Sequence, residues 1–106
     1  MLAYILVEVD IHDAVQYAAY REMTPASLKA YNGKFIVRGG PTELLEGTQE
    51  PKRIVVIEFP TKERAKAWWA SEEYAPAKAL RQRTATTRMI LAEGWPQVPG
   101  PPTGGE

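Results

Sequence analysis

The sequence predicts one small α+β domain whose strands and helices follow the order βαββαβ. Four stretches rich in β-branched and aromatic residues alternate with two stretches in which apolar residues recur at helical spacing. At 106 residues the chain is long enough for one hydrophobic core and too short for two. We expect the domain to span residues 1–94. Residues 95–106, rich in proline and glycine, are expected to form a flexible C-terminal tail.

The strands are expected where apolar stretches meet glycine, proline or a helix start. They are residues 2–9, 34–38, 53–59 and 86–93. The first and third are the most apolar, so they should lie at the centre of an antiparallel sheet. Two β–helix–β halves of this kind form the split βαβ pattern of ferredoxin-like domains, with the helices on one face.

The first helix is expected to begin after Asp13, whose side chain can accept a hydrogen bond from the amide of Gln16. Pro25 predicts a kink, after which a second helical segment runs to a left-handed turn at Asn32 and Gly33. The buried stripe of the helix is predicted to consist of its apolar residues at helical spacing, which are Val15, Ala18, Ala19 and Met23.

The second helical stretch is expected to start at Thr61, with Ser71 capping a further segment. Between the second and third strands, residues 40–52 form a connection that is long for a hairpin. Leu44 and Leu45 within it predict that this connection packs against the domain rather than standing free.

Alternation along the strands gives the sheet two apolar faces. One face is uniformly apolar and should lie under the helices: Ala3, Ile5, Val7, Val9, Phe35, Val37, Val55, Ile57 and Phe59. The opposite face carries Tyr4, Leu6, Ile36, Ile54 and Val56, together with the charged residues Glu8, Arg38 and Glu58. Two helical stretches can cover only one side of a four-stranded sheet, so the second face predicts a homodimer that packs face to face.

Composition excludes several classes of function. The 13 basic and 13 acidic residues balance, so the chain has no net field to attract nucleic acid or an anionic membrane. The absence of cysteine excludes disulfides, thiol catalysis and thiolate metal sites. No secretion signal or apolar span is recognisable, so we expect a cytoplasmic protein.

Several motifs in order resemble one known family. They read GKFIVRGG at residues 33–40, LEG at 45–47, PKRIVVIEFP at 51–60 and AWWASEEY at 67–74. Together they are similar to the domain-of-unknown-function family thirteen-thirty, over roughly residues 4–94. The resemblance implies the dimeric α/β-barrel superfamily of ferredoxin-like fold. That superfamily contains small monooxygenases, isomerases, haem enzymes and ligand-sensing domains, so the resemblance implies a fold rather than one activity.

Arg38 is the first candidate binding residue, because Gly39 and Gly40 follow it and allow close approach of main-chain amides to an anion. Strand alternation places Arg38 on the same face as Glu58, which favours an ion pair between the two as the alternative. Both residues are kept as candidates for a ligand site at the dimer interface.

A second candidate site is formed by Tyr20, Tyr74 and Arg81. Tyr74 and Arg81 are seven residues apart, about two helical turns, and could point together into a pocket beside Tyr20. Packing in the core is the alternative for the aromatic residues. No residue stands out as a general base, since the single histidine, His12, lies at the end of a strand.

Asp10, His12 and Asp13 have side chains that suit a metal, but a dedicated site needs more partners at better spacing. We therefore expect no metal or other cofactor, with Asp13 capping the helix and His12 exposed. The function that the sequence favours is binding of a small organic molecule, with an anion as one option, in a cavity between sheet and helices. A cofactor-independent monooxygenase- or isomerase-like enzyme is one alternative, and a purely structural or interaction module is the other.

Overall fold

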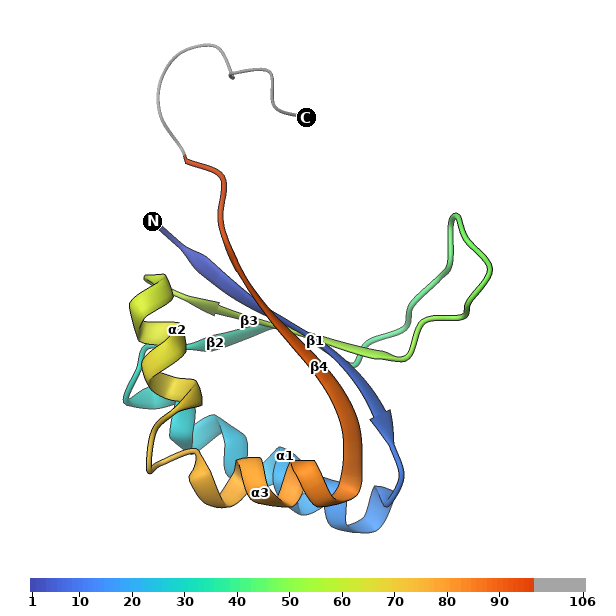
Figure 1. The fold of residues 1–106 in the computed structure, drawn as a ribbon, viewed down its shortest axis with the longest axis horizontal. Coiled ribbons are helices and arrows are strands. Elements are labelled where there is room, and N and C mark those ends of the chain that lie inside the picture. Colours follow the sequence, from blue (N-terminus) through green and yellow to red (C-terminus); the bar gives the residue numbers. More distant parts are fainter. Residues whose placement is uncertain (97–106) are drawn as a thin grey trace.

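Four antiparallel strands form one sheet in the order β2-β3-β1-β4 in the computed structural model, which describes residues 1–96 (Figure 1). The strands are β1 Ala3–Ile11, β2 Lys34–Arg38, β3 Arg53–Phe59 and β4 Ala85–Glu93. The predicted α+β class and the central position of β1 and β3 are confirmed. The bounds of β2 and β3 agree with the prediction, whereas β1 and β4 each differ from it by one or two residues.

Three helices lie on one side of this sheet and leave the other side uncovered (Figure 1). They are α1 Ala14–Lys29, α2 Lys62–Trp69 and α3 Ala75–Thr84. Asp13 caps α1 as predicted, because its Oδ1 accepts from the amide of Gln16 at 3.1 Å. Helix α1 continues through Pro25 as one helix, so the predicted separate segment after the proline does not form.

The core lies between the helices and the inner face of the sheet, where the central strands and the first residue of β4 supply buried side chains. These are Ala3, Ile5, Val7, Val9, Val55, Ile57, Phe59 and Ala85. The prediction for the buried stripe of α1 is wrong, since the side chain of Val15 is 85% exposed. The buried stripe is Tyr17, Tyr20, Thr24, Ser27 and Leu28. Tyrosine and leucine bury far more apolar area than alanine, so the helix turns these larger residues toward the sheet.

A β-bulge in β2 changes which side of the sheet its last residues face. Phe35 pairs with Ile57, but Val37 pairs with Val56, so Ile36 is an extra residue. Val37 therefore lies on the outer face, and Arg38, opposite Val55, lies on the inner face. The predicted faces of Val37 and Arg38 are both wrong, because simple alternation does not include the extra residue.

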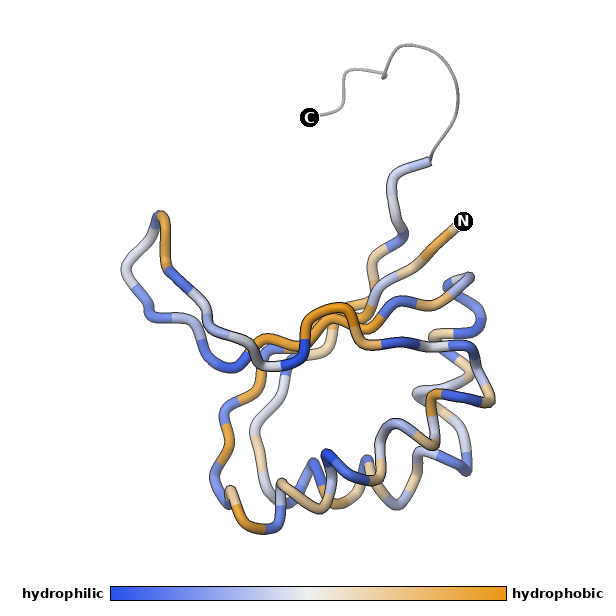
Figure 2. The backbone as a smooth tube through the Cα atoms, turned by 180° about the vertical axis from the view of Figure 1, so that it is seen from behind, coloured by the Kyte–Doolittle hydropathy of each residue, from blue (hydrophilic) through white to orange (hydrophobic). Residues whose placement is uncertain are grey.

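The connection between β2 and β3 projects away from the sheet and the helices (Figure 1). Leu45 within it is 90% exposed, so the predicted packing of this connection is wrong for that residue. The connection leaves the sheet on the side away from the helices, so the hydrophobic core lies out of its reach. Figure 2 shows an apolar stretch within this projecting loop as well as along the central strands.

The outer face of the sheet is apolar and has no covering helix among residues 1–96. Leu6 and Ile90 pair across β1 and β4 on this face and are 41% and 47% exposed. Its charges are matched within the chain, since Glu8 lies opposite Arg88 in the register. No helix in this part of the chain is long and apolar enough to span a membrane. Except for Trp95 and Pro96, the predicted tail lies outside the described residues.

Candidate functional site

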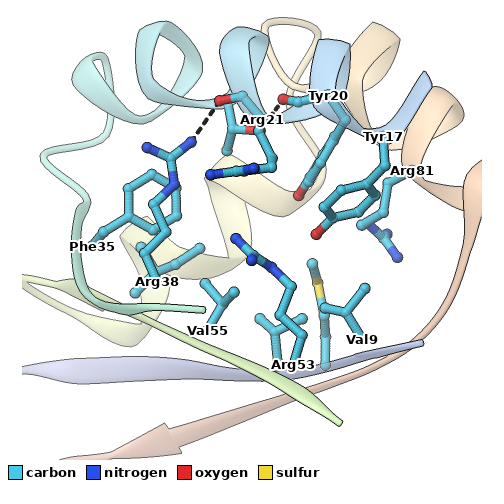
Figure 3. Close-up of a pocket in the computed structure, with 13 residues that line it drawn as sticks. Val9, Tyr17, Tyr20, Arg21, Phe35, Arg38, Arg53, Val55 and Arg81 are labelled. Atoms are coloured by element: carbon cyan, nitrogen blue, oxygen red, sulfur yellow. Dashed lines mark hydrogen bonds between the residues drawn. The ribbon is translucent and has the colours of Figure 1, made fainter. Parts of the chain in front are cut away.

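A narrow pocket lies between α1 and the inner face of the sheet, lined by thirteen side chains (Figure 3). We call it the arginine pocket. Its polar lining residues are Tyr17, Tyr20, Arg21, Thr24, Arg38, Arg53 and Arg81, and its apolar ones are Val7, Val9, Phe35, Val55, Ile57 and Met89. Its free volume is about 20 Å³, enough for about one water molecule.

Arg38 reaches the pocket from the edge strand because of the β-bulge, and its guanidinium is held from two sides (Figure 3). One nitrogen, Nη2, donates to the main-chain oxygen of Arg21 at 2.5 Å. Pro25 has no N–H, so the usual helical hydrogen bond to that oxygen cannot form. The guanidinium carbon also lies 4.1 Å from the centre of the Phe35 ring.

Arg53 points into the same pocket from the start of β3, where it pairs with Val9 (Figure 3). A side chain at Gly39 would overlap its guanidinium, and Gly39 adopts a φ of +70°, a conformation that glycine tolerates best. Gly39 therefore makes room for Arg53. The Nε atom of Arg53 is buried and has no hydrogen-bond partner within residues 1–96.

Arg81 closes the inner end of the pocket and is only 5% exposed. Its Nε donates to the hydroxyl of Tyr74 at 3.2 Å, and the Tyr74 hydroxyl shares a hydrogen bond of 2.8 Å with that of Tyr20. The predicted meeting of these three side chains is therefore confirmed. Tyr20 and Arg81 line the pocket, whereas Tyr74 is fully buried behind them.

The pocket is strongly cationic, because four arginines line it and no lining side chain is acidic. None of the four makes an ion pair with a carboxylate of the described residues 1–96. Burial, followed by repulsion from Arg21 and Arg53, lowers the pKa of Arg38. Burial also raises the pKa of Tyr17 and Tyr20, so both hydroxyls keep their protons at neutral pH and can donate hydrogen bonds.

Glu58 does not contribute to this pocket. It lies on the outer face of β3, where its carboxylate is 3.3 Å from Nζ of Lys34. The predicted ion pair between Arg38 and Glu58 is therefore wrong, because the bulge turns Arg38 to the other side of the sheet. The guanidinium of Arg38 donates instead to the main-chain oxygen of Arg21.

Sequence reasoning missed two of the four arginines. Arg53 could have been found, since alternation along β3 places it on the same face as Val55 and Ile57. Arg21 follows Tyr20 directly and lies four residues after Tyr17, so it stands at the border of the buried stripe of α1. Because the side chain of Arg21 is exposed, the pattern of buried residues gives no sign that it lines the pocket.

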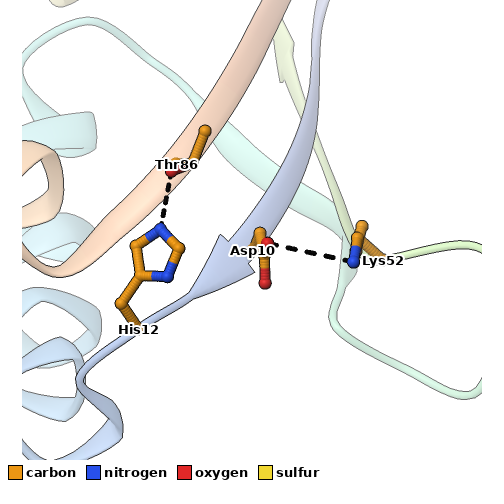
Figure 4. Close-up of polar contacts among 4 residues, drawn as sticks. All are labelled: Asp10, His12, Lys52 and Thr86. Atoms are coloured by element: carbon orange, nitrogen blue, oxygen red, sulfur yellow. Dashed lines mark hydrogen bonds and ion pairs between the residues drawn. The ribbon is translucent and has the colours of Figure 1, made fainter.

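The residues that suit a metal are engaged elsewhere (Figure 4). The Nε2 atom of His12 lies 2.6 Å from the hydroxyl of Thr86, and the carboxylate of Asp10 lies 3.8 Å from Nζ of Lys52. Asp13 caps α1. Among residues 1–96, no three histidine, cysteine or acidic side chains lie close enough to hold a metal ion.

Solved structures share this architecture at low sequence identity. A protein of unknown function from Rhodopseudomonas palustris, RPA0582, is 19% identical with a TM-score of 0.73, over 90% of this chain and 83% of that one. A dimeric ferredoxin-like protein of unknown function from Jannaschia sp. CCS1 is 14% identical with a TM-score of 0.70, over 89% and 100% of the two chains. SnoaB, a cofactor-independent oxygenase from Streptomyces nogalater, is 13% identical with a TM-score of 0.63, over 93% and 98%.

At these identities the similarity establishes the fold alone, and the predicted ferredoxin-like fold is confirmed. No curated protein matches the chain. A family model described as a domain of unknown function, DUF1330, matches residues 2–95. The motifs that suggested this family all lie within the matched range, and the chain belongs to the DUF1330 family.

Proposed function

We propose that the protein binds a small organic acid and holds its acidic group in the arginine pocket. The observation that carries this proposal is the set of four arginines around a pocket with no acidic lining residue. Guanidinium groups bind carboxylates and phosphates through paired, charge-assisted hydrogen bonds. An anion in the pocket would supply the opposite charge that the chain itself does not place there.

The burial of Arg81 supports an anionic ligand over a neutral one. The Arg81 residue is 5% exposed, so its guanidinium loses most of its hydration, and its Nε donates to the uncharged hydroxyl of Tyr74. Arg53 adds a buried nitrogen without a partner. A bound anion would offset the lost hydration of Arg81 and the uncompensated charge of Arg53. Affinity is therefore expected to depend strongly on the ligand's charge.

An enzyme of the cofactor-independent oxygenase or isomerase type is the second candidate, and the fold similarity to SnoaB favours it. Such chemistry needs a group that removes a proton from the substrate. The arginine pocket is lined by no histidine, aspartate or glutamate, and the raised pKa of Tyr20 makes that hydroxyl a poor base. These features support binding more strongly than proton abstraction.

Calorimetric titration with benzoate and with benzamide tests the proposal. Arg53→Met is expected to weaken benzoate binding about ten-fold or more, because it removes a charged hydrogen-bond donor. Arg83→Met, at an exposed position of α3, is the matched control and should leave the affinity within about two-fold. The melting temperature of ligand-free Arg53→Met should equal or exceed that of the wild type, because repulsion among the arginines is relieved.

Benzamide has the shape of benzoate without its charge, so it should bind at least ten-fold more weakly. Equal affinities for benzoate and benzamide, or benzoate binding that Arg53→Met leaves unchanged, would contradict the proposal. Failure of a panel of small carboxylates and phosphates to bind at millimolar concentration would favour a structural or interaction module instead.

We also propose that the protein is a homodimer that packs through the outer face of the sheet. Leu6, Val37 and Ile90 are exposed there without a covering helix. Glu58 of this face is paired with Lys34, and Glu8 lies opposite Arg88 in the register, so burial of these charges costs less than burial of isolated ones. The Jannaschia protein of the same fold is described as dimeric. The projecting loop could extend the same contact through Leu45.

A further inference from the structure

Two wider cavities adjoin the arginine pocket on the side of β4. The first, which we call the apolar chamber, lies between α2 and the sheet and has a free volume of about 270 Å³. It is lined by Ile5, Ala65, Lys66, Trp69, Met89 and Leu91. The second, which we call the connecting cavity, lies between α3 and β4 and has a free volume of about 370 Å³.

The three spaces share lining residues. Met89 borders all of them, Arg81 borders both the arginine pocket and the connecting cavity, and Trp69 borders the connecting cavity and the apolar chamber. The three spaces are therefore neighbours around Met89, and a molecule whose acidic group lies at Arg81 would pass this flexible side chain to reach the apolar chamber.

Size decides where the body of a ligand can lie. The arginine pocket has room for about one water molecule, which suits a carboxylate group and excludes an organic chain or ring. The two wider cavities approach the volumes of ordinary small-molecule sites, which are about 300–1,000 Å³. The hydrophobic part of an organic acid must therefore extend toward α2 and β4.

The three spaces differ in charge and polarity. Four arginines line the inner pocket, and the connecting cavity is mostly polar, with Arg81, Gln82 and Thr87 among its lining residues. The apolar chamber is mostly apolar, although Lys66 also lines it. Most of the charge and most of the apolar surface thus lie in different spaces.

We propose that the ligand is an amphipathic acid whose acidic group contacts Arg81 and Arg53 and whose apolar tail lies in the chamber between Ala65, Trp69 and Leu91. The inference rests on the proposed binding of an organic acid and specifies the class of acid. Short acids without a tail should bind weakly, since they fill only the arginine pocket.

A series of linear carboxylates from butanoate to octanoate, measured by calorimetry, tests this proposal. Each added methylene is expected to raise the affinity about three- to four-fold while the tail enters the chamber. Ala65→Leu should reduce the chamber volume and remove most of the gain for octanoate while leaving butanoate unchanged. Ala67→Leu, at an exposed position on the same helix, is the matched control. Leu91→Trp fills the chamber from the opposite wall if Ala65→Leu does not fold.

Octan-1-ol separates failure of this inference from failure of the proposed function. If butanoate and octanoate bind equally and both depend on Arg53, the arginine pocket stands and the tail site is overturned. If octan-1-ol binds as tightly as octanoate, and Arg53→Met affects neither, the acid site fails while the chamber remains a binding site. Octanoate binding that depends on both Arg53 and the chamber, with octan-1-ol at least ten-fold weaker, supports both.

Discussion

Pro25 and Arg38 are linked through one atom, the main-chain oxygen of Arg21. Pro25 cannot donate the helical hydrogen bond that this oxygen would ordinarily accept, and Nη2 of Arg38 donates to it instead. A residue that weakens α1 thus supplies the anchor for an arginine of the candidate site. Stability and binding are expected to respond in opposite directions when the proline is replaced.

Pro25→Ala restores the missing N–H, which should raise the free energy of unfolding by up to about 3 kcal/mol. The restored donor competes with Arg38, so affinity for octanoate is expected to fall several-fold. Pro25→Gly restores the N–H without the helix propensity of alanine, so it should weaken binding with a smaller gain in stability. Denaturant unfolding and calorimetry measure the two effects, and an affinity that is unchanged in both variants would contradict the link.

Gly39→Ala is expected to harm both stability and binding. The added methyl group overlaps the guanidinium of Arg53, and the left-handed conformation at φ +70° costs about 1–2 kcal/mol with a side chain. Displacement of the Arg53 side chain in Gly39→Ala should lower the affinity for benzoate about as much as Arg53→Met does. Gly40→Ala is the control, since apart from Gly40 itself and its two chain neighbours no atom of residues 1–96 lies within 4 Å of the new carbon. Equal benzoate affinities in the two alanine variants would argue against this role of Gly39.

Tyr74→Phe should destabilise the protein by about 1–3 kcal/mol, because it leaves the buried Tyr20 hydroxyl and Arg81 Nε without their shared partner. Tyr31→Phe removes a hydroxyl that bonds to exposed Glu73 and should cost much less. Chemical denaturation of both variants gives the comparison. Equal losses in the free energy of unfolding for Tyr74→Phe and Tyr31→Phe would contradict a stabilising role of the hydrogen bonds among Tyr20, Tyr74 and Arg81.

Alkaline pH is expected to destabilise the fold through its buried tyrosines. The pKa of Tyr20 is raised in the folded state from an ordinary value of 10.0, chiefly by burial and then by Tyr74. Above that value the unfolded chain binds fewer protons than the folded one, so the free energy of unfolding falls as pH rises. Between about pH 8 and about pH 12 the melting temperature of Tyr20→Phe should fall less steeply with pH than that of the wild type. A decline as steep as in the wild type would contradict this contribution, and Tyr4→Phe on the outer face provides the comparison.

Leu6→Glu is expected to dissociate the proposed dimer. An unpaired carboxylate at the centre of an apolar interface should raise the dimer dissociation constant at least about a hundred-fold. Val15→Glu changes an apolar residue that is 85% exposed on α1 and should have no effect on assembly. Light scattering distinguishes the 11.8 kDa monomer from a dimer. Leu45→Lys tests the projecting loop in the same way, and a wild type that is monomeric at micromolar concentration would overturn the proposal.

Strand positions were predictable from the sequence because glycine and proline mark their ends. The bounds of β2 and β3 agree with expectation for this reason, since Gly33 precedes β2 and Pro60 follows β3. The buried stripe of α1 was not predictable from apolar character alone. Tyr17 and Tyr20 outweigh the more numerous alanines in buried area, and Thr24 and Ser27 are buried because their hydroxyls bond to main-chain oxygens within the helix.

The candidate site was predictable in part. Tyr74 stands at the N-cap of α3 and Arg81 lies two turns further along the same helix, so both side chains lie on one side of it. Tyr20 of α1 meets them there through its hydrogen bond to Tyr74. Arg38 was identified, but with the wrong face and the wrong partner. No glycine marks the bulge between Phe35 and Val37, so the sequence offered no signal that alternation stops there.

The bulge in β2 makes pairing register, as well as residue identity, a determinant of the arginine pocket. A homologue with the same number of residues in this strand but no bulge would carry its arginine to the opposite side of the sheet, although that arginine aligns with Arg38 without a gap. A homologue that lacks the residue at the position of Ile36 would keep its arginine on the inner face by simple alternation. Transfer of a binding property among homologues therefore requires that the pairing register of this strand be compared before the residues themselves.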